Sequence, residues 1–140
     1  MIKSQKKSGF TLVELLVVMA ILALLIGLVG PQVMKQFRGA KSHTARLQIE
    51  DFSAGLDLFY LDNGRYPDSR EGLEALIHTP ANAEKWAGPY LKKNKIPQDP
   101  WGEDYHYQSP GDHGEYDIYS YGADRSPGGD GDNADITNWQ

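Results

Sequence analysis

The last 20 residues of the chain contain four aspartates, Asp124, Asp130, Asp132 and Asp135, spaced among glycines. Four like charges on a short glycine-rich segment repel one another, so a counter-ion would be needed to order it. Carboxylate oxygens and freely oriented backbone carbonyls suit Ca²⁺, whereas Zn²⁺ prefers His or Cys and Mg²⁺ retains most of its waters. The pattern predicts a calcium-binding loop, with a solvated, disordered acidic tail as the alternative.

This acidic segment does not have the pattern of an EF-hand. A loop counted from Asp130 would place Ala134 where an EF-hand requires an acidic ligand. Any calcium site here would therefore be irregular and would depend on how the glycines direct the backbone carbonyls.

A second chemical pattern lies near the other end of the chain. Residues Met1–Gly9 hold Lys3, Lys6 and Lys7 and no acid, and Phe10–Gly30 is a run of 21 residues with one charge. A secretory signal peptide would have a shorter apolar run ending in a small-x-small site. The apparent processing point, Gly9-Phe10, instead precedes the run. Cleavage there would keep the apolar segment and leave 11 basic and 19 acidic side chains, a net charge of −8.

The single charge in the apolar run is Glu14. A charged side chain in a bilayer costs roughly 2.5–3.5 kcal/mol at mid-span, less near an end, and usually has a partner or a function. The α-amine that cleavage would create on Phe10 is the nearest candidate cation, in the same helix or in a neighbouring copy. The alternative is a carboxylate that snorkels to the headgroups without a partner.

The composition argues against two functional classes. The chain has 14 basic and 19 acidic residues, and this net charge of −5 disfavours nucleic acid, whose phosphates need a clustered basic face. There is no cysteine, which excludes disulfides and thiolate chemistry. The four histidines are scattered, and no phosphate-loop or nucleophile-elbow motif is present. Glu103 and Asp104 are adjacent, so on an extended strand they would face opposite ways, and we do not expect an enzyme.

One long helix is expected to connect the processing point to the rest of the chain. Residues 10–30 would form about 31 Å of helix, which matches a hydrocarbon core of roughly 30 Å. The leading lysines predict that the N-terminus stays cytoplasmic. Residues 31–63 continue as an amphipathic helix that ends near Asp62-Asn63-Gly64. Its apolar stripe has steps of four and three residues and consists of Ala45, Ile49, Phe52, Leu56 and Phe59.

Residues 64–140 are expected to form a small head. Asp68-Ser69-Arg70-Glu71 has the pattern of a capping box, which predicts a second helix that Pro80 ends. Residues 78–102 are proline-rich and loop-like, and their cluster of Lys92, Lys93 and Lys95 is either a solvated loop or a docking patch.

Two short strands are predicted later in the head. They span Tyr105–Gln108 and Tyr116–Ser120, on either side of a turn at Ser109–Gly114. Their tyrosines should pack on the apolar stripe of the long helix.

The stretch Gly9-Phe10-Thr11-Leu12-Val13-Glu14, between a basic leader and an apolar run, resembles the class III leader of type IV pilins and pseudopilins. The resemblance implies that a prepilin peptidase cleaves after Gly9 and methylates the new amine of Phe10. It also implies a helical filament in which Glu14 meets a neighbour's N-terminus. Pro31 matches the proline at which such helices loosen.

Three further motifs are similar to one branch of this group, the major pseudopilins of type II secretion. They are Leu61–Pro67 (LDNGRYP), Glu71–Leu76 (EGLEAL) and Pro97–Gly102 (PQDPWG). The branch implies an α+β, pilin-like lollipop in which a long helix, half transmembrane and half amphipathic, packs on a head with a short antiparallel sheet. The alternative is a type IV pilin of an adhesive or motility fibre.

The resemblance also implies a calcium loop at about residues 121–135. Asp124 and Asp135 match acidic ligands of the branch, and Tyr121 and Ser126 match its main-chain carbonyl ligands. Ala134 stands where some members have another acid, so Asp132 or Asp130 would have to substitute, and we select Asp132.

The branch further implies where the chain works and with what. It would be a single-pass protein of the bacterial inner membrane whose periplasmic head enters a homopolymeric pseudopilus. The implied partners are minor pseudopilins and the inner-membrane secretion platform.

Overall fold

The computed structural model describes residues 8–140, so the expected leader lysines at positions 3, 6 and 7 lie outside the described residues. Its main element is α1 (Leu12–Asn63), a helix of 52 residues. The chain divides between Phe37 and Arg38 into two compact units, and α1 contributes to both.

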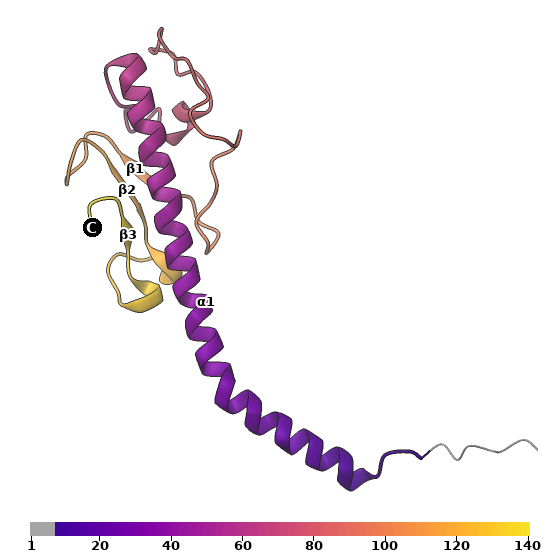
Figure 1. Ribbon diagram of the computed structural model, residues 1–140. Coiled ribbons are helices and arrows are strands. Elements are labelled where there is room, and N and C mark those ends of the chain that lie inside the picture. The colour runs from indigo at the N-terminus through magenta and orange to yellow at the C-terminus, as the bar shows by residue number, and fades with distance from the viewer. Residues whose placement is uncertain (1–7) are drawn as a thin grey trace, which may run out of the picture. The chain divides into compact units, whose positions relative to one another are not determined.

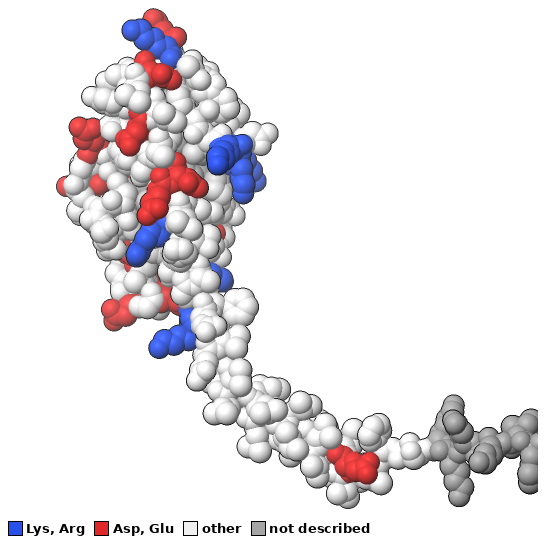
Figure 2. All heavy atoms as spheres, viewed as in Figure 1, with Lys and Arg blue, Asp and Glu red and all other residues white. Residues whose placement is uncertain are grey.

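In the N-terminal unit, α1 opens with a capping box. The backbone N–H of Glu14 donates to Thr11 Oγ1 (3.2 Å), and the backbone N–H of Thr11 donates to Glu14 Oε2 (3.3 Å). Pro31 lies inside the helix and has no N–H, so one backbone hydrogen bond is missing there. The helix is long and apolar enough to cross a membrane, and its apolar stretch is unburied. Between Leu12 and Met34 the one charged residue is Glu14, and Figure 2 shows this acid near the start of α1, followed by a long uncharged stretch.

In the second unit, the later part of α1 carries the core of the head. All five residues of the predicted apolar stripe are buried, and they pack with Leu76, Tyr105, Ile118 and Ile136. The ring of Tyr105 meets Phe52 edge-on at 5.1 Å, as expected for a tyrosine packed on the stripe. The helix ends at Asn63, and Gly64 (φ 71°) donates its N–H to the carbonyl of Tyr60 (2.7 Å), which confirms the predicted C-terminal cap.

The head contains a three-stranded antiparallel sheet in the order β1-β2-β3 (Figure 1). The strands are β1 (His106–Gln108), β2 (Asp117–Ser120) and β3 (Ile136–Thr137). His106 pairs with Tyr119, and Ser120 pairs with Ile136. The two predicted strands are confirmed, and β3 is an addition that places the end of the acidic segment in the sheet.

The predicted second helix is wrong. The expected capping hydrogen bonds do form. Asp68 Oδ1 accepts the N–H of Glu71 (2.8 Å), and Glu71 Oε2 accepts the N–H of Asp68 (2.9 Å). Gly72 then adopts a positive φ of 62°, which interrupts helical geometry. Only the four-residue 3₁₀ helix η1 (Leu73–Leu76) follows, and it buries Leu73 and Leu76.

The carboxylate of Glu71 also holds the guanidinium of Arg65 through two hydrogen bonds (2.7 and 2.9 Å). The hydrogen bonds with Arg65 outweigh the opposing effect of burial and lower the pKa of Glu71. A carboxyl with a lowered folded pKa adds stability above its unfolded pKa of about 4.3. That stability is lost as the pH falls through the folded value.

We therefore expect Glu71→Gln to destabilise the head by about 1–3 kcal/mol at neutral pH, since a charge-assisted pair is removed. The difference from wild type should shrink as the pH falls below about 4.3, the unfolded pKa, and through the lowered folded pKa of Glu71, because protonation removes the charge of the wild-type side chain. Urea unfolding of the full chain in detergent, followed by tryptophan fluorescence across this pH range, measures it. Glu74→Gln, which changes an exposed acid, is the control. A destabilisation by Glu71→Gln that stays constant down to pH 2.5 would contradict the assignment.

Candidate assembly and metal-binding sites

The predicted processing site lies just before α1. Gly9 and Phe10 are exposed and outside regular secondary structure, and a Cβ added at Gly9 would meet no other atom within 4 Å. Among residues 8–140, no other part of the chain therefore blocks access to the Gly9–Phe10 peptide bond.

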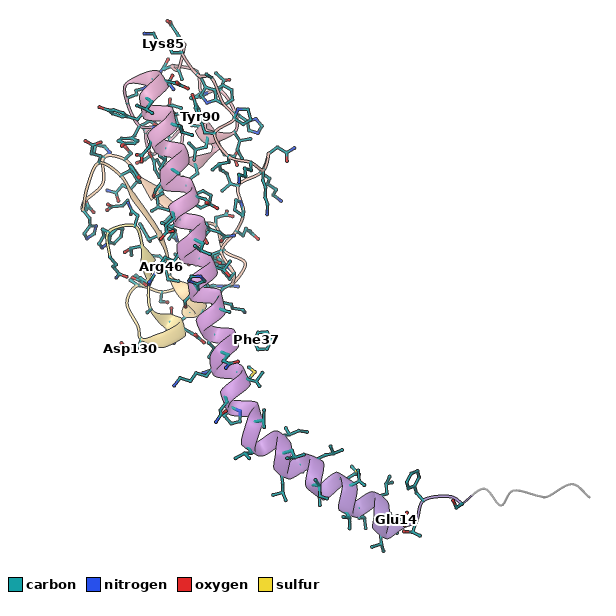
Figure 3. All side chains as sticks on the ribbon, in the orientation of Figure 1. Glu14, Phe37, Arg46, Lys85, Tyr90 and Asp130 are labelled. Atoms are coloured by element: carbon teal, nitrogen blue, oxygen red, sulfur yellow. The ribbon has the colours of Figure 1, made fainter. Side chains whose placement is uncertain are left out.

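Glu14 lies in the first turn of α1 (Figure 3). Besides the assembly role expected from its position, it caps the helix with Thr11, as described above. The sequence signal was available, because Thr-x-x-Glu before an apolar run is the capping-box pattern. One carboxylate therefore caps the helix in the single chain, in addition to the assembly role that the sequence predicts for it.

The acidic segment folds into two short 3₁₀ helices, η2 (Gly122–Asp124) and η3 (Gly131–Asn133), which contact each other. A Cβ added to Gly122 would come within 2.6 Å of the Asp132 carbonyl oxygen and 2.8 Å of the Ala134 carbonyl oxygen. Gly122 also has a positive φ of 75°. This glycine thus allows the two halves of the loop to approach closely.

The predicted ligand residues lie on both halves of this loop. The carboxylate of Asp124 accepts the N–H of Ser126 (3.1 Å), and Asp135 Oδ2 accepts the N–H of Gly128 (3.0 Å). Tyr121 is held beside the sheet, with its ring 4.7 Å from that of His106. Local hydrogen bonds and ring packing therefore fix the backbone on which the predicted ligands stand.

The other two aspartates differ from this pair. Asp132 Oδ2 lies 3.3 Å from Nε of Arg38, an ion pair that the sequence analysis did not predict. Asp130 is exposed at the outer edge of the loop (Figure 3). Arg38 and Asp132 are 94 positions apart in the sequence, so sequence patterning carries no local signal for their contact.

One buried oxygen of the loop fits the predicted calcium ion, although the acidic side chains do not form a cluster. Within residues 8–140, no three or more carboxylate or imidazole side chains are close enough together to hold a metal. Asp135 Oδ1, however, is buried and has no hydrogen-bond partner. A buried, unpartnered carboxylate oxygen is costly, and a cation beside it would remove that cost.

The described chain thus combines an apolar helix, preceded by a processing-type motif, with a small head built on the continuation of that helix and a short antiparallel sheet. This combination defines a pilin-like subunit. Residues 32–139 match the family model described as type II secretion system, protein G, and residues 4–30 match the prokaryotic N-terminal methylation motif. The chain belongs to the type II secretion system protein G family.

Curated relatives agree with the family model. A type II secretion system core protein G of Pseudomonas aeruginosa is 45% identical over 139 residues, covering 96% of each chain. One of Vibrio cholerae is 43% identical over 140 residues, covering 98% of this chain and 94% of the relative.

A solved structure confirms the fold. The major pseudopilin from the type 2 secretion system of enterohaemorrhagic Escherichia coli matches with a TM-score of 0.65 and 33% identity, over 76% of this chain and 88% of that one. The predicted α+β fold and the predicted family are confirmed. The alternative of an adhesive or motility pilin is not better supported by these matches.

Proposed function

We propose that this chain is the structural subunit of a periplasmic pseudopilus, and that its polymerisation drives the export of proteins by type II secretion. The observation that carries the proposal is the apolar first half of α1, whose side chains are exposed in the single chain. The chain also belongs to a family of type II secretion proteins. Such a surface needs a lipid environment or other copies to cover it. Its role is structural, and catalysis is no part of the proposal.

Before assembly the subunit is anchored in the inner membrane, with its N-terminus in the cytoplasm and its head in the periplasm. The three leader lysines support this orientation, because positive charge is retained on the cytoplasmic side. A prepilin peptidase cleaves after Gly9 and methylates Phe10, consistent with the N-terminal methylation motif over residues 4–30. The proposed partners are minor pseudopilins and the inner-membrane platform, and nucleic acid is not among them.

Assembly places Glu14 of one subunit beside the α-amine of Phe10 of another. The pairing offsets the cost of a carboxylate in the apolar region and sets the axial register of neighbouring subunits. The need for a charged partner applies only to the first turn of α1, since Glu14 is the one charged residue between positions 10 and 30.

The loop at about residues 121–135 is proposed to bind one calcium ion. Asp124 and Asp135 supply carboxylates, Tyr121 and Ser126 supply carbonyl oxygens, and Asp132 is a further ligand if it exchanges its ion pair with Arg38. The unpartnered Oδ1 of Asp135 supports the proposal. Calcium would join the two halves of the loop and reduce repulsion among acidic heads.

Deletion of the gene tests the secretory role. We expect exoproteins to accumulate inside the cell while twitching and attachment are unchanged, because only the secretion filament loses its subunit. Enzyme activity assays on culture medium and cell fractions measure the first effect, and expression of the intact chain in trans should restore release. Normal secretion with lost twitching or attachment would instead identify a motility or adhesive pilin.

A further inference from the structure

Asp99 is a buried carboxylate that lies outside the acidic loop and is 5% exposed. Its Oδ1 accepts the backbone N–H groups of Trp101 (3.0 Å) and Glu103 (2.8 Å). Its Oδ2 accepts the hydroxyl of Ser120 at 2.6 Å. Both oxygens are therefore hydrogen-bonded, which offsets the free-energy cost of burying the carboxylate. The same hydrogen bonds connect residues 99–103 to the end of β2.

Ser120 extends this hydrogen-bond network into the acidic loop. The residue is fully buried, and its Oγ both donates to Asp99 and accepts the N–H of Gly122 (3.2 Å). Gly122 follows Tyr121, the proposed carbonyl ligand, and precedes Asp124 by two residues. A continuous chain of hydrogen bonds therefore runs from Asp99 through Ser120 to the first half of the loop.

The second half of the loop rests on the same glycine. The carbonyls of Asp132 and Ala134 pack so closely on Gly122 that no side chain would fit there. The hydrogen bond from the Gly122 N–H to Ser120 therefore also helps to fix the backbone segment that leads to Asp135. A weaker, exposed link runs parallel to this one, since Arg125 Nη1 lies 3.1 Å from Glu103 Oε1.

We propose that Asp99 and Ser120 are positioning residues for the calcium loop. They contact no ion themselves and hold Tyr121–Asp124 against residues 132–135 so that both halves present their oxygens together. This inference rests on the proposed calcium site. It gives Asp99, the buried carboxylate of the Pro-Gln-Asp-Pro-Trp-Gly motif, a role in supporting that site. Groups that orient metal ligands typically change metal affinity 10–100-fold when they are removed.

Ser120→Ala in the full chain, solubilised in detergent, tests the proposal. We expect the dissociation constant for calcium, measured by isothermal titration calorimetry, to rise about tenfold or more. Thr137→Val is the matched control. Thr137 is a buried hydroxyl residue opposite Tyr119 in the sheet, and its Oγ1 has no hydrogen-bond partner, so calcium affinity should stay within about twofold of wild type.

A second measurement separates positioning from simple stability. Melting temperatures in excess chelator and in calcium give the calcium-induced rise for each variant, and Ser120→Ala should reduce that rise even if its melting in chelator is also lower. An unchanged rise, with wild-type affinity, would overturn the positioning role and leave the calcium site intact. If the wild-type chain binds no calcium, the proposed metal function fails first and the positioning role fails with it.

Discussion

Glu14→Gln is expected to weaken filament assembly and to reduce exoprotein release by about tenfold or more, because a loss of roughly 1.4 kcal/mol per contact is a tenfold change in association. Glutamine at this position still accepts the Thr11 N–H, since a capping box takes either residue. It has no charge to pair with the α-amine of Phe10 in a neighbouring subunit. Enzyme assays of the culture medium and electron microscopy of sheared filaments measure the two effects.

The two roles of Glu14 are separated by a second variant. Thr11→Ala removes the hydroxyl that accepts the Glu14 N–H and leaves the carboxylate charge in place. It should cost the helix about 0.5–2 kcal/mol and leave secretion near wild type. If Thr11→Ala is as defective as Glu14→Gln, the helix cap explains the defect. If Glu14→Gln secretes normally, inter-subunit charge pairing is not required.

The long helix was predictable because its signals are local. The apolar run from Phe10 is recognised by its length, which is enough to span a bilayer. The stripe ending at Phe59 repeats over several turns, and an apolar period of that length has few alternative explanations. Its end was predictable because Asn63 and Gly64 are typical of a helix C-terminus.

The wrong prediction of a second helix and the missed third strand have opposite causes. Asp68 and Glu71 form a true capping box, but Gly72 at positive φ stops the helix that such a box usually begins. Ile136 and Thr137 form a strand only because β2 is already there to pair with them. Two residues are too few to show the alternation by which a strand is recognised in a sequence.

The candidate metal site was predictable in composition and not in detail. Acidic residues among glycines indicate a calcium loop, but the pattern cannot show that Arg38 pairs with Asp132 or that Ser120 links Asp99 to Gly122. Both contacts depend on the packing of the loop against distant parts of the chain. For the same reason Asp132 and Asp130 looked equivalent in the sequence, and the structure separates them by partner and exposure.

Removing calcium is expected to lower the melting temperature of the head by roughly 10–20 °C. Calcium at about 100 times its dissociation constant adds about 2.7 kcal/mol, and 1 kcal/mol shifts a domain of this size by about 4–8 °C. Asp124→Asn and Asp135→Asn should each remove most of the difference between calcium and chelator. Differential scanning calorimetry of the full chain in detergent, with calcium or with chelator, measures the shift.

The choice of asparagine keeps this test specific to charge and coordination. It retains an oxygen that can accept the N–H of Ser126 or Gly128, so the backbone contacts of the loop can survive the change. Asp130→Asn, at the exposed edge, is the matched control and should keep the full calcium response. Equal melting in calcium and in chelator for the wild-type chain would mean that the loop is held by its own hydrogen bonds. The buried Oδ1 of Asp135 would then be a tolerated cost of the fold, and calcium could not be what relieves repulsion between neighbouring heads.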